Sequence, residues 1–148
     1  MAHFSFSLAK VLNWRTTVVA REEATLTQLL SECQRVASEL QALAGEYQQE
    51  WHQVTGQTAL TPAALAPLAW YREGVISRRH LLLAEQAELG RRVQEQQRRV
   101  AAAKQAEELL VRVKERRLAV WQTEQHRQLE ELAAESFSAK WVREQQCE

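Results

Sequence analysis

Residues 26–54, with the sequence LTQLLSECQRVASELQALAGEYQQEWHQV, decide the fold of this chain. Their apolar side chains recur alternately every four and every three residues, which is the heptad spacing of a coiled-coil seam. The predicted seam consists of Leu26, Leu30, Cys33, Ala37, Leu40, Ala44, Tyr47, Trp51 and Val54. Leu29, Val36 and Leu43 widen the apolar stripe, as expected of a helix that packs in a hairpin.

A second helix follows a single break in this pattern. We expect the first helix at about residues 7–54, the break at about residues 55–66 and the second helix at about residues 67–142. The second helix has its own apolar repeat, which Gln96 and Glu107 interrupt. The repeat consists of Leu68, Val75, Leu82, Leu89, Val93, Val100, Ala103 and Leu110. This layout predicts an all-α fold: two long helices in an antiparallel coiled-coil hairpin, forming one elongated domain.

Four residues around the break indicate where the helices end and begin. Gly56 suits the C-terminus of the first helix, because glycine takes a left-handed backbone at little cost. Thr61 and Pro62 suit the N-cap and the first position of the second helix. Pro67 lacks the N–H that a helix interior needs. The second helix therefore begins either at Pro62, with a kink, or at Pro67 after a short turn.

Folding the chain back about residue 61 predicts the register of the hairpin, in which Leu40 faces Leu82. Residues beyond about Leu118 then have no partner within the chain. They nevertheless include Trp121, Leu129, Leu132, Phe137, Trp141 and Val142. An unpaired apolar stripe indicates a binding partner, and a frayed, partly disordered tail is the alternative.

Composition narrows the classes of function. Lys+Arg and Asp+Glu number 19 each among 148 residues, so no net basic field attracts nucleic acid or a membrane. No run of about 18 apolar residues predicts a transmembrane helix, and we expect no direct membrane insertion. Cys33 and Cys147 form no metal or redox motif. We expect both to be free thiols, with Cys33 half-buried.

Motifs for catalysis and for metal binding are missing from the sequence. The four histidines have no partners at ligand spacing, and no phosphate loop or nucleophile motif is present. A two-helix rod also does not exclude water around a reacting group, which catalysis usually requires. We therefore expect no enzyme activity, no metal and no cofactor.

Four pairs of adjacent arginines suggest nucleic-acid binding at first sight. Glutamates lie between them at spacings of three and four residues, which indicates a solvated helix face with internal ion pairs. No interleaved aromatic residues or nucleic-acid fold accompany the pairs, so we expect no nucleic-acid partner. The pairs are Arg78-Arg79, Arg91-Arg92, Arg98-Arg99 and Arg116-Arg117.

The first residues carry an apolar segment made of Phe4, Phe6, Leu8, Val11 and Leu12. A membrane-surface helix is one interpretation, but Lys10 and Arg15 give it little basic charge. Packing on the second helix near Val113 and Val120 is the interpretation that we favour.

Three motifs carry a resemblance to a known family. They are the opening Phe4-x-Phe6-x-Leu8-x-x-Val11-Leu12-x-x-Arg15, the segment Tyr47-Gln-Gln-Glu-Trp51 and the segment Arg117-Leu-Ala-Val-Trp121-Gln-Thr. Together with the length and the long-helix layout, they make the chain similar to the flagellar export protein FliJ family. The resemblance covers essentially the whole chain but departs at residues 141–147, where many members have an acidic helix.

The resemblance implies a non-enzymatic, stalk-like component of the flagellar type III export apparatus. Such a protein is cytoplasmic and lies at the inner face of the cell membrane. Its terminal end inserts in the hexameric export ATPase and promotes assembly and activity of that ring. Its loop-proximal region contacts the membrane export-gate protein, and family members also bind export chaperones. The alternatives are a coiled-coil chaperone escort or structural adaptor without an ATPase contact, or the equivalent stalk of a virulence-type secretion system.

Two surfaces follow as candidate sites. The predicted ATPase contact consists of Phe4, Phe6, Leu8, Leu12, Arg15, Arg116, Arg117, Leu118 and Trp121. The predicted export-gate contact consists of Leu43, Tyr47, Trp51, Tyr71 and Val75. The alternative for Tyr47 and Trp51 is that they seal the core of the hairpin near the loop.

Overall fold

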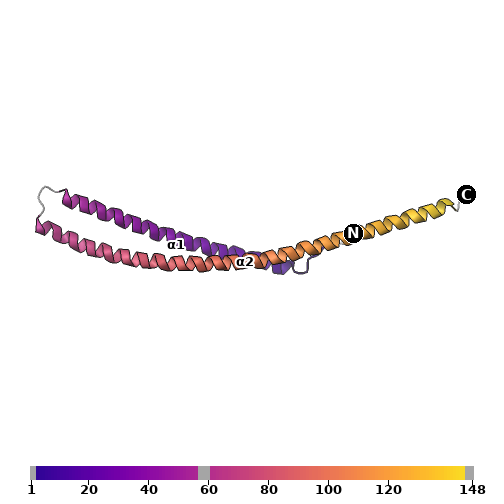
Figure 1. Cartoon of the computed structure of the whole chain (residues 1–148), viewed down its shortest axis with the longest axis horizontal. Coiled ribbons are helices and arrows are strands. Elements are labelled where there is room, and N and C mark those ends of the chain that lie inside the picture. The colour runs from indigo at the N-terminus through magenta and orange to yellow at the C-terminus, as the bar shows by residue number, and fades with distance from the viewer. Residues whose placement is uncertain (1–2, 57–60, 146–148) are drawn as a thin grey trace. The chain divides into compact units, whose positions relative to one another are not determined.

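The computed structural model describes residues 3–56 and 61–145, apart from the side chains of Ala64 and Glu144. It contains two long helices, α1 (Ala9–Thr55) and α2 (Pro62–Gln145) (Figure 1). No strand occurs among the described residues. The chain is therefore an all-α helical hairpin, as predicted.

The chain divides into two units. The loop unit is Val19–Ala102, and the terminal unit combines Met1–Val18 with Ala103–Glu148. Each helix contributes to both units. The contacts below are given for each unit by itself.

The helix boundaries follow the local chemistry of their ends. The N–H of Ala9 donates to the carbonyl of Phe6 at 3.0 Å, which closes the first turn of α1. The N–H of Gly56 donates to the carbonyl of His52 at 2.9 Å and closes the last turn. At the start of α2, the N–H of Leu65 donates to the carbonyl of Thr61 at 3.3 Å.

The second helix begins at Pro62, the earlier of the two predicted starts, so the break is shorter than residues 55–66. Pro62 occupies the first turn, where its missing N–H would have no helical acceptor and its fixed φ suits the helix. Pro67 lies inside α2 and forfeits one hydrogen bond, to the carbonyl of Ala63. One lost bond does not terminate a helix that gains others on both sides. Residues 57–60 of the predicted break lie outside the described residues.

Gly56 is needed for space and not for a left-handed backbone. No described glycine has a positive φ, so the predicted left-handed C-terminal geometry is wrong. A Cβ atom at this position would lie 2.9 Å from the carbonyl oxygen of His52, closer than real Cβ atoms approach. The last turn of α1 is tight enough that only glycine fits it without a shift.

The seam of α1 in the loop unit keeps one of the two predicted heptad positions, that of Cys33 and Leu40, and replaces the other by the neighbouring residue. Val36, Leu82 and Leu89 form the buried cluster, with exposed fractions of 0%, 2% and 5%. The half-buried residues packed against this cluster are Leu29, Cys33, Leu40 and Leu43. The half-buried Cys33 was expected, whereas Cys147 lies outside the described residues.

Three residues of the predicted seam are exposed: Leu30 at 48%, Trp51 at 45%, and Ala44. Leu29 and Leu43, which were expected only to widen the stripe, take the places of Leu30 and Ala44. Both sets recur every seven residues, so spacing alone does not separate them. The set with Val36 and Leu43 buries more apolar area than the set with Ala37 and Ala44, and apolar burial decides between them.

The register in the loop unit is also displaced toward the loop. Arg35 bonds to Glu85 at 2.6 Å, and Arg78 bonds to Glu39 at 3.2 Å. Each partner on α2 lies closer to the loop than a fold-back about residue 61 predicts, by up to about one helical turn. Because α1 ends at Thr55 and α2 begins at Pro62, the midpoint between the two helix ends lies before residue 61, and this shift follows.

Polar residues that interrupt the predicted repeat of α2 find polar partners on α1. In the loop unit, Gln96 is 5% exposed. Its side-chain amide donates to the carbonyl of Glu22 at 3.0 Å and also to the carboxylate of the same residue. In the terminal unit, the hydroxyl of Thr16 donates to the carboxylate of Glu107 at 2.6 Å. Each interruption is therefore satisfied by a hydrogen bond, as polar groups in a seam require.

The two adjacent leucines of α1 test which set of positions forms the seam. Leu29→Ala should lower the free energy of unfolding by about 2 kcal/mol, because Leu29 packs on the core cluster. Leu30→Ala is the matched control and should cost under about 1 kcal/mol, because Leu30 is 48% exposed. Urea unfolding followed by circular dichroism measures both. The opposite ranking would restore the predicted seam.

Glycine substitutions test the close approach at the end of α1. Gly56→Ala should lower the free energy of unfolding by about 1 kcal/mol or more, since its methyl group would meet the His52 carbonyl. Gly90→Ala, where a Cβ meets nothing within 4 Å, should instead stabilise by roughly 0.5 to 1 kcal/mol. Thermal unfolding of the two variants should shift in opposite directions. A shared direction would contradict the steric explanation.

Candidate interaction surfaces

The terminal surface is built where the residues before α1 meet α2. The Phe4 and Trp121 rings lie 5.9 Å apart at a tilt of 56°, a favourable aromatic geometry. The Arg117 guanidinium lies 5.7 Å from the centre of the Phe6 ring and donates to the Ser7 hydroxyl at 2.8 Å. Two aromatic contacts and one hydrogen bond thus attach the segment before Ala9 to α2.

The other predicted members of this surface lie around these contacts in different environments. Leu8, Leu12 and Leu118 are half-buried. Arg15 is half-buried, and its guanidinium stacks 4.8 Å from the ring centre of its neighbour Trp14. Arg116 is exposed. The sequence therefore predicted a set that the structure brings together in part.

The N-terminal segment packs on α2 near the predicted position, through Arg117 and Trp121. Val120 is 70% exposed, and Val113 is 36% exposed. Trp121 is the residue that meets Phe4. Successive residues of a helix point about 100° apart, so Val120 faces away when Trp121 faces the segment. Val120 instead lines a shallow surface pocket of about 430 Å³, together with Arg116, Arg117, Trp121 and Glu124.

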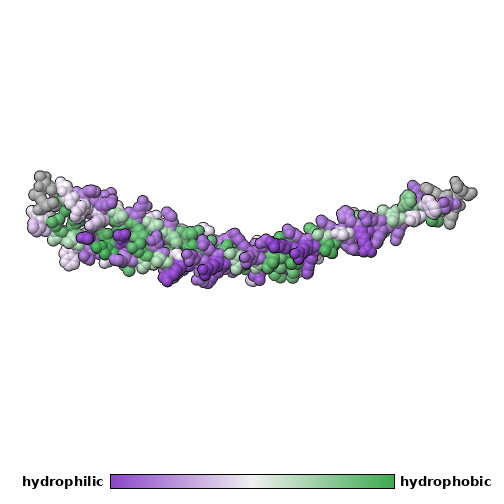
Figure 2. All heavy atoms as spheres, viewed as in Figure 1, coloured by the Kyte–Doolittle hydropathy of each residue, from purple (hydrophilic) through white to green (hydrophobic). Residues whose placement is uncertain are grey.

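The end of α2 is a continuous helix whose described side chains are all exposed from residue 126 onward. The helix continues to Gln145. Figure 2 shows hydrophobic side chains near the C-terminal end of α2. The large apolar residues there are Leu129, Leu132, Phe137, Trp141 and Val142, each at least 46% exposed.

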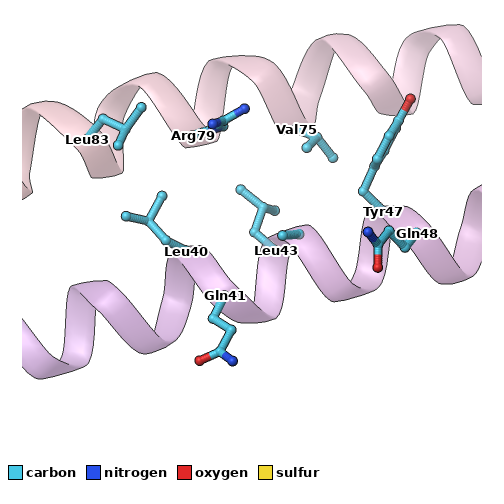
Figure 3. Close-up of a pocket in the computed structure, with 9 residues that line it drawn as sticks. Leu40, Gln41, Leu43, Tyr47, Gln48, Val75, Arg79 and Leu83 are labelled. Carbon is cyan, nitrogen blue, oxygen red and sulfur yellow. The ribbon is translucent and has the colours of Figure 1, made fainter.

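The loop-proximal surface assembles four of its five predicted residues. The Tyr47 and Tyr71 rings stack at 6.4 Å with planes 9° apart, joining α1 to α2. Leu43, Tyr47 and Val75 line a groove of about 540 Å³ (Figure 3). Trp51 does not line this groove and is 45% exposed, because it lies off the seam that α1 uses.

Trp70 was missed in the prediction from sequence. It is 82% exposed, the highest value among the exposed large hydrophobic residues of the described chain. It directly precedes Tyr71, which lies in the stack with Tyr47, so a helical wheel places it well away from the seam. An off-seam tryptophan beside a seam tyrosine was the signal that could have found it.

Glutamates engage half of the arginines in the four adjacent pairs. Glu88 bonds to both Arg91 and Arg92, at 2.8 and 3.3 Å, and Arg99 bonds to Glu95 at 2.6 Å. The fourth engaged arginine is Arg78, which bonds to Glu39. Within the described residues, the other four make no ion pair, although one of them, Arg117, bonds to the Ser7 hydroxyl. The remaining three are Arg79, Arg98 and Arg116.

Glu39 lies at the centre of an ion-pair network that crosses from α1 to α2. It accepts from Arg35 at 2.6 Å and from Arg78 at 3.2 Å, while Arg35 also bonds to Glu85. The hydrogen bond from Arg35 is the main cause that lowers the pKa of Glu39. The same contacts raise the pKa of Arg35, with Glu39 the largest cause.

The network predicts part of the acid sensitivity of the hairpin. Since the pKa of Glu39 is lowered in the folded chain, its stabilisation is present above the unfolded value of 4.5 and is lost as pH falls through the folded value. Glu39→Gln should therefore narrow the gap between thermal midpoints measured near pH 6 and near pH 3. Glu135→Gln is the control, because Glu135 lies in the exposed end of α2 and makes no ion pair among the described residues. An equal effect of both substitutions would contradict a special role for Glu39.

The described residues contain no cluster of three or more His, Cys, Asp or Glu side chains that could hold a metal ion. Over the same residues, neither helix has a stretch apolar and long enough to cross a membrane. No protein-family model, curated protein or solved structure matches this chain. The functional argument therefore depends on the terminal and loop-proximal surfaces.

Proposed function

We propose that this protein is a non-enzymatic, stalk-like component of the flagellar type III export apparatus. Its terminal surface would enter the pore of a hexameric export ATPase and promote assembly and activity of the ring. The observation that carries the proposal is the attachment of the N-terminal segment to α2 through Phe4, Phe6, Arg117 and Trp121. These residues belong to the motifs that resemble the export family.

The mechanism proposed is a bias on ring conformation by an asymmetric insert. A two-helix hairpin presents different side chains in different directions, so six equivalent subunits would meet unequal contacts. A ligand shifts a conformational equilibrium only through a difference in its contacts with the two states. Arg116 and the apolar pocket beside Val120 and Trp121 offer charge and apolar area for such contacts.

The loop-proximal surface would contact the membrane export-gate protein. The support for this assignment is the Tyr47–Tyr71 stack and the groove beside it. The protein would then be cytoplasmic and peripheral at the inner face of the cell membrane, held there through the export apparatus. Export chaperones are further proposed partners, for which the exposed apolar residues at the end of α2 provide a surface.

The experiment measures ATP hydrolysis and ring assembly of the cognate export ATPase with increasing amounts of this chain. The wild-type chain should raise both. Arg116→Glu should lower the stimulation several-fold, because Arg116 is exposed and makes no ion pair among the described residues, so its reversal leaves the hairpin intact.

Arg98→Glu is the matched control, since Arg98 has the same exposure class and the same lack of an ion pair but belongs to the loop unit. It should stimulate as the wild type does. A wild-type chain that changes neither hydrolysis nor assembly refutes the stalk function. Chaperone binding without any effect on the ATPase would assign the chain to the escort class instead.

A further inference from the structure

The line of apolar residues on α1 that the seam leaves unused is itself periodic. Leu30, Ala37, Ala44 and Trp51 recur every seven residues. Leu30 is 48% exposed and Trp51 is 45% exposed. A helix with a second heptad line beside its first has the pattern of a helix that contacts two neighbours. Leu30, Ala44 and Trp51 of this line are exposed, and Ala37 is half-buried.

A matching line runs along α2 on the far side of a groove. Ile76 and Leu83 lie seven residues apart and are 38% and 41% exposed. The groove of about 540 Å³ is lined by Ala44 of α1 and Leu83 of α2. Leu40 and Leu43 project from α1 toward α2 in Figure 3, with Val75 opposite them. From the two lines, Ala44 and Leu83 reach the groove itself, so apolar side chains of both helices flank its apolar floor.

One charged side chain lines this groove. Arg79 is the only charged residue among the lining residues, and it makes no ion pair within the described chain. Its neighbour Arg78, in contrast, bonds to Glu39 at 3.2 Å. The remaining polar lining residues are the neutral amides Gln41 and Gln48. An occupant of the groove would therefore meet a positive charge with no internal carboxylate to offset it.

We propose that this groove binds an amphipathic α-helix of a partner protein, with apolar side chains on the floor and a carboxylate facing Arg79. The two heptad lines favour a helix over an extended peptide, since their spacing matches helical ridges. The groove itself is lined by residues 40–48 of α1, about 12 Å of helix, and the exposed line beside it runs about 32 Å from Leu30 to Trp51. The inference rests on the proposed role of the loop-proximal surface in partner binding, and it is independent of the ATPase contact.

A second copy of this chain fits the groove less well than an acidic partner helix. A symmetric dimer would use the same patch on both chains. Two copies of this face would bring two Arg79 side chains into one interface without a carboxylate from the groove lining. Like charges placed together oppose association.

The test uses two synthetic helical peptides as probes. Each has about 21 residues with leucine at both seam positions of every heptad, and the flanking positions carry glutamate in one peptide and lysine in the other. Calorimetry with the full chain should show the glutamate peptide binding at least about tenfold more tightly. Arg79→Glu should weaken the glutamate peptide by about fivefold to tenfold and strengthen the lysine peptide. Arg98→Glu, an equal change of charge outside the groove, should alter neither.

Shape is tested separately from charge. Ala44→Trp places a large side chain in the groove and should abolish binding of the glutamate peptide, while circular dichroism of the hairpin stays unchanged because Ala44 is exposed. Equal binding of both peptides, or no effect of Arg79→Glu, would overturn the proposal. So would a dimer in sedimentation velocity that Ala44→Trp dissociates, because the groove would then belong to a second copy.

Discussion

Burial of Val36 against Leu82 and Leu89 is the contact on which the loop unit depends. A two-helix hairpin has no third layer, so a helix face is buried only where it packs against the other helix. The apolar area gained by one line of positions over the next therefore fixes how α1 is rotated about its axis. That rotation determines which side chains remain outside, including Leu30, Ala44 and Trp51.

The general fold was predictable because helical periodicity and a single break survive in the sequence. The rotation of α1 about its axis was not predictable. The predicted and the observed seam share one heptad position and differ by a single residue at the other. Ala37 and Ala44 satisfy an apolar pattern as well as Val36 and Leu43 do, although they bury less area. The register was missed for a related reason, because Pro62 and Pro67 both suit a helix start and the choice between them moves the pairing.

The candidate surfaces were predictable where aromatic residues lie on a seam and less so elsewhere. Tyr47 of α1 meets Tyr71 of α2, and Phe4, which precedes α1, meets Trp121 of α2, as their positions suggested. Trp51 belongs to the predicted heptad line that the seam does not use, so it lies outside the stack of Tyr47 and Tyr71. Arg15 was expected at the terminal surface, but its guanidinium has a nearer aromatic face in Trp14. Which of several nearby aromatic rings a guanidinium stacks on does not appear as a periodic pattern in the sequence.

The buried amide of Gln96 has a consequence for alignment. Its two acceptors both belong to Glu22. Gln96 therefore reaches them only when α2 lies at one particular position along the axis of α1. A slide of one heptad would move this amide to where Leu89 now lies, among leucine and valine side chains that accept no hydrogen bond. An apolar residue at that position would allow such a slide at less cost. The hydrogen bonds of this single glutamine therefore fix the register of two helices whose repetitive apolar patterns would otherwise allow more than one.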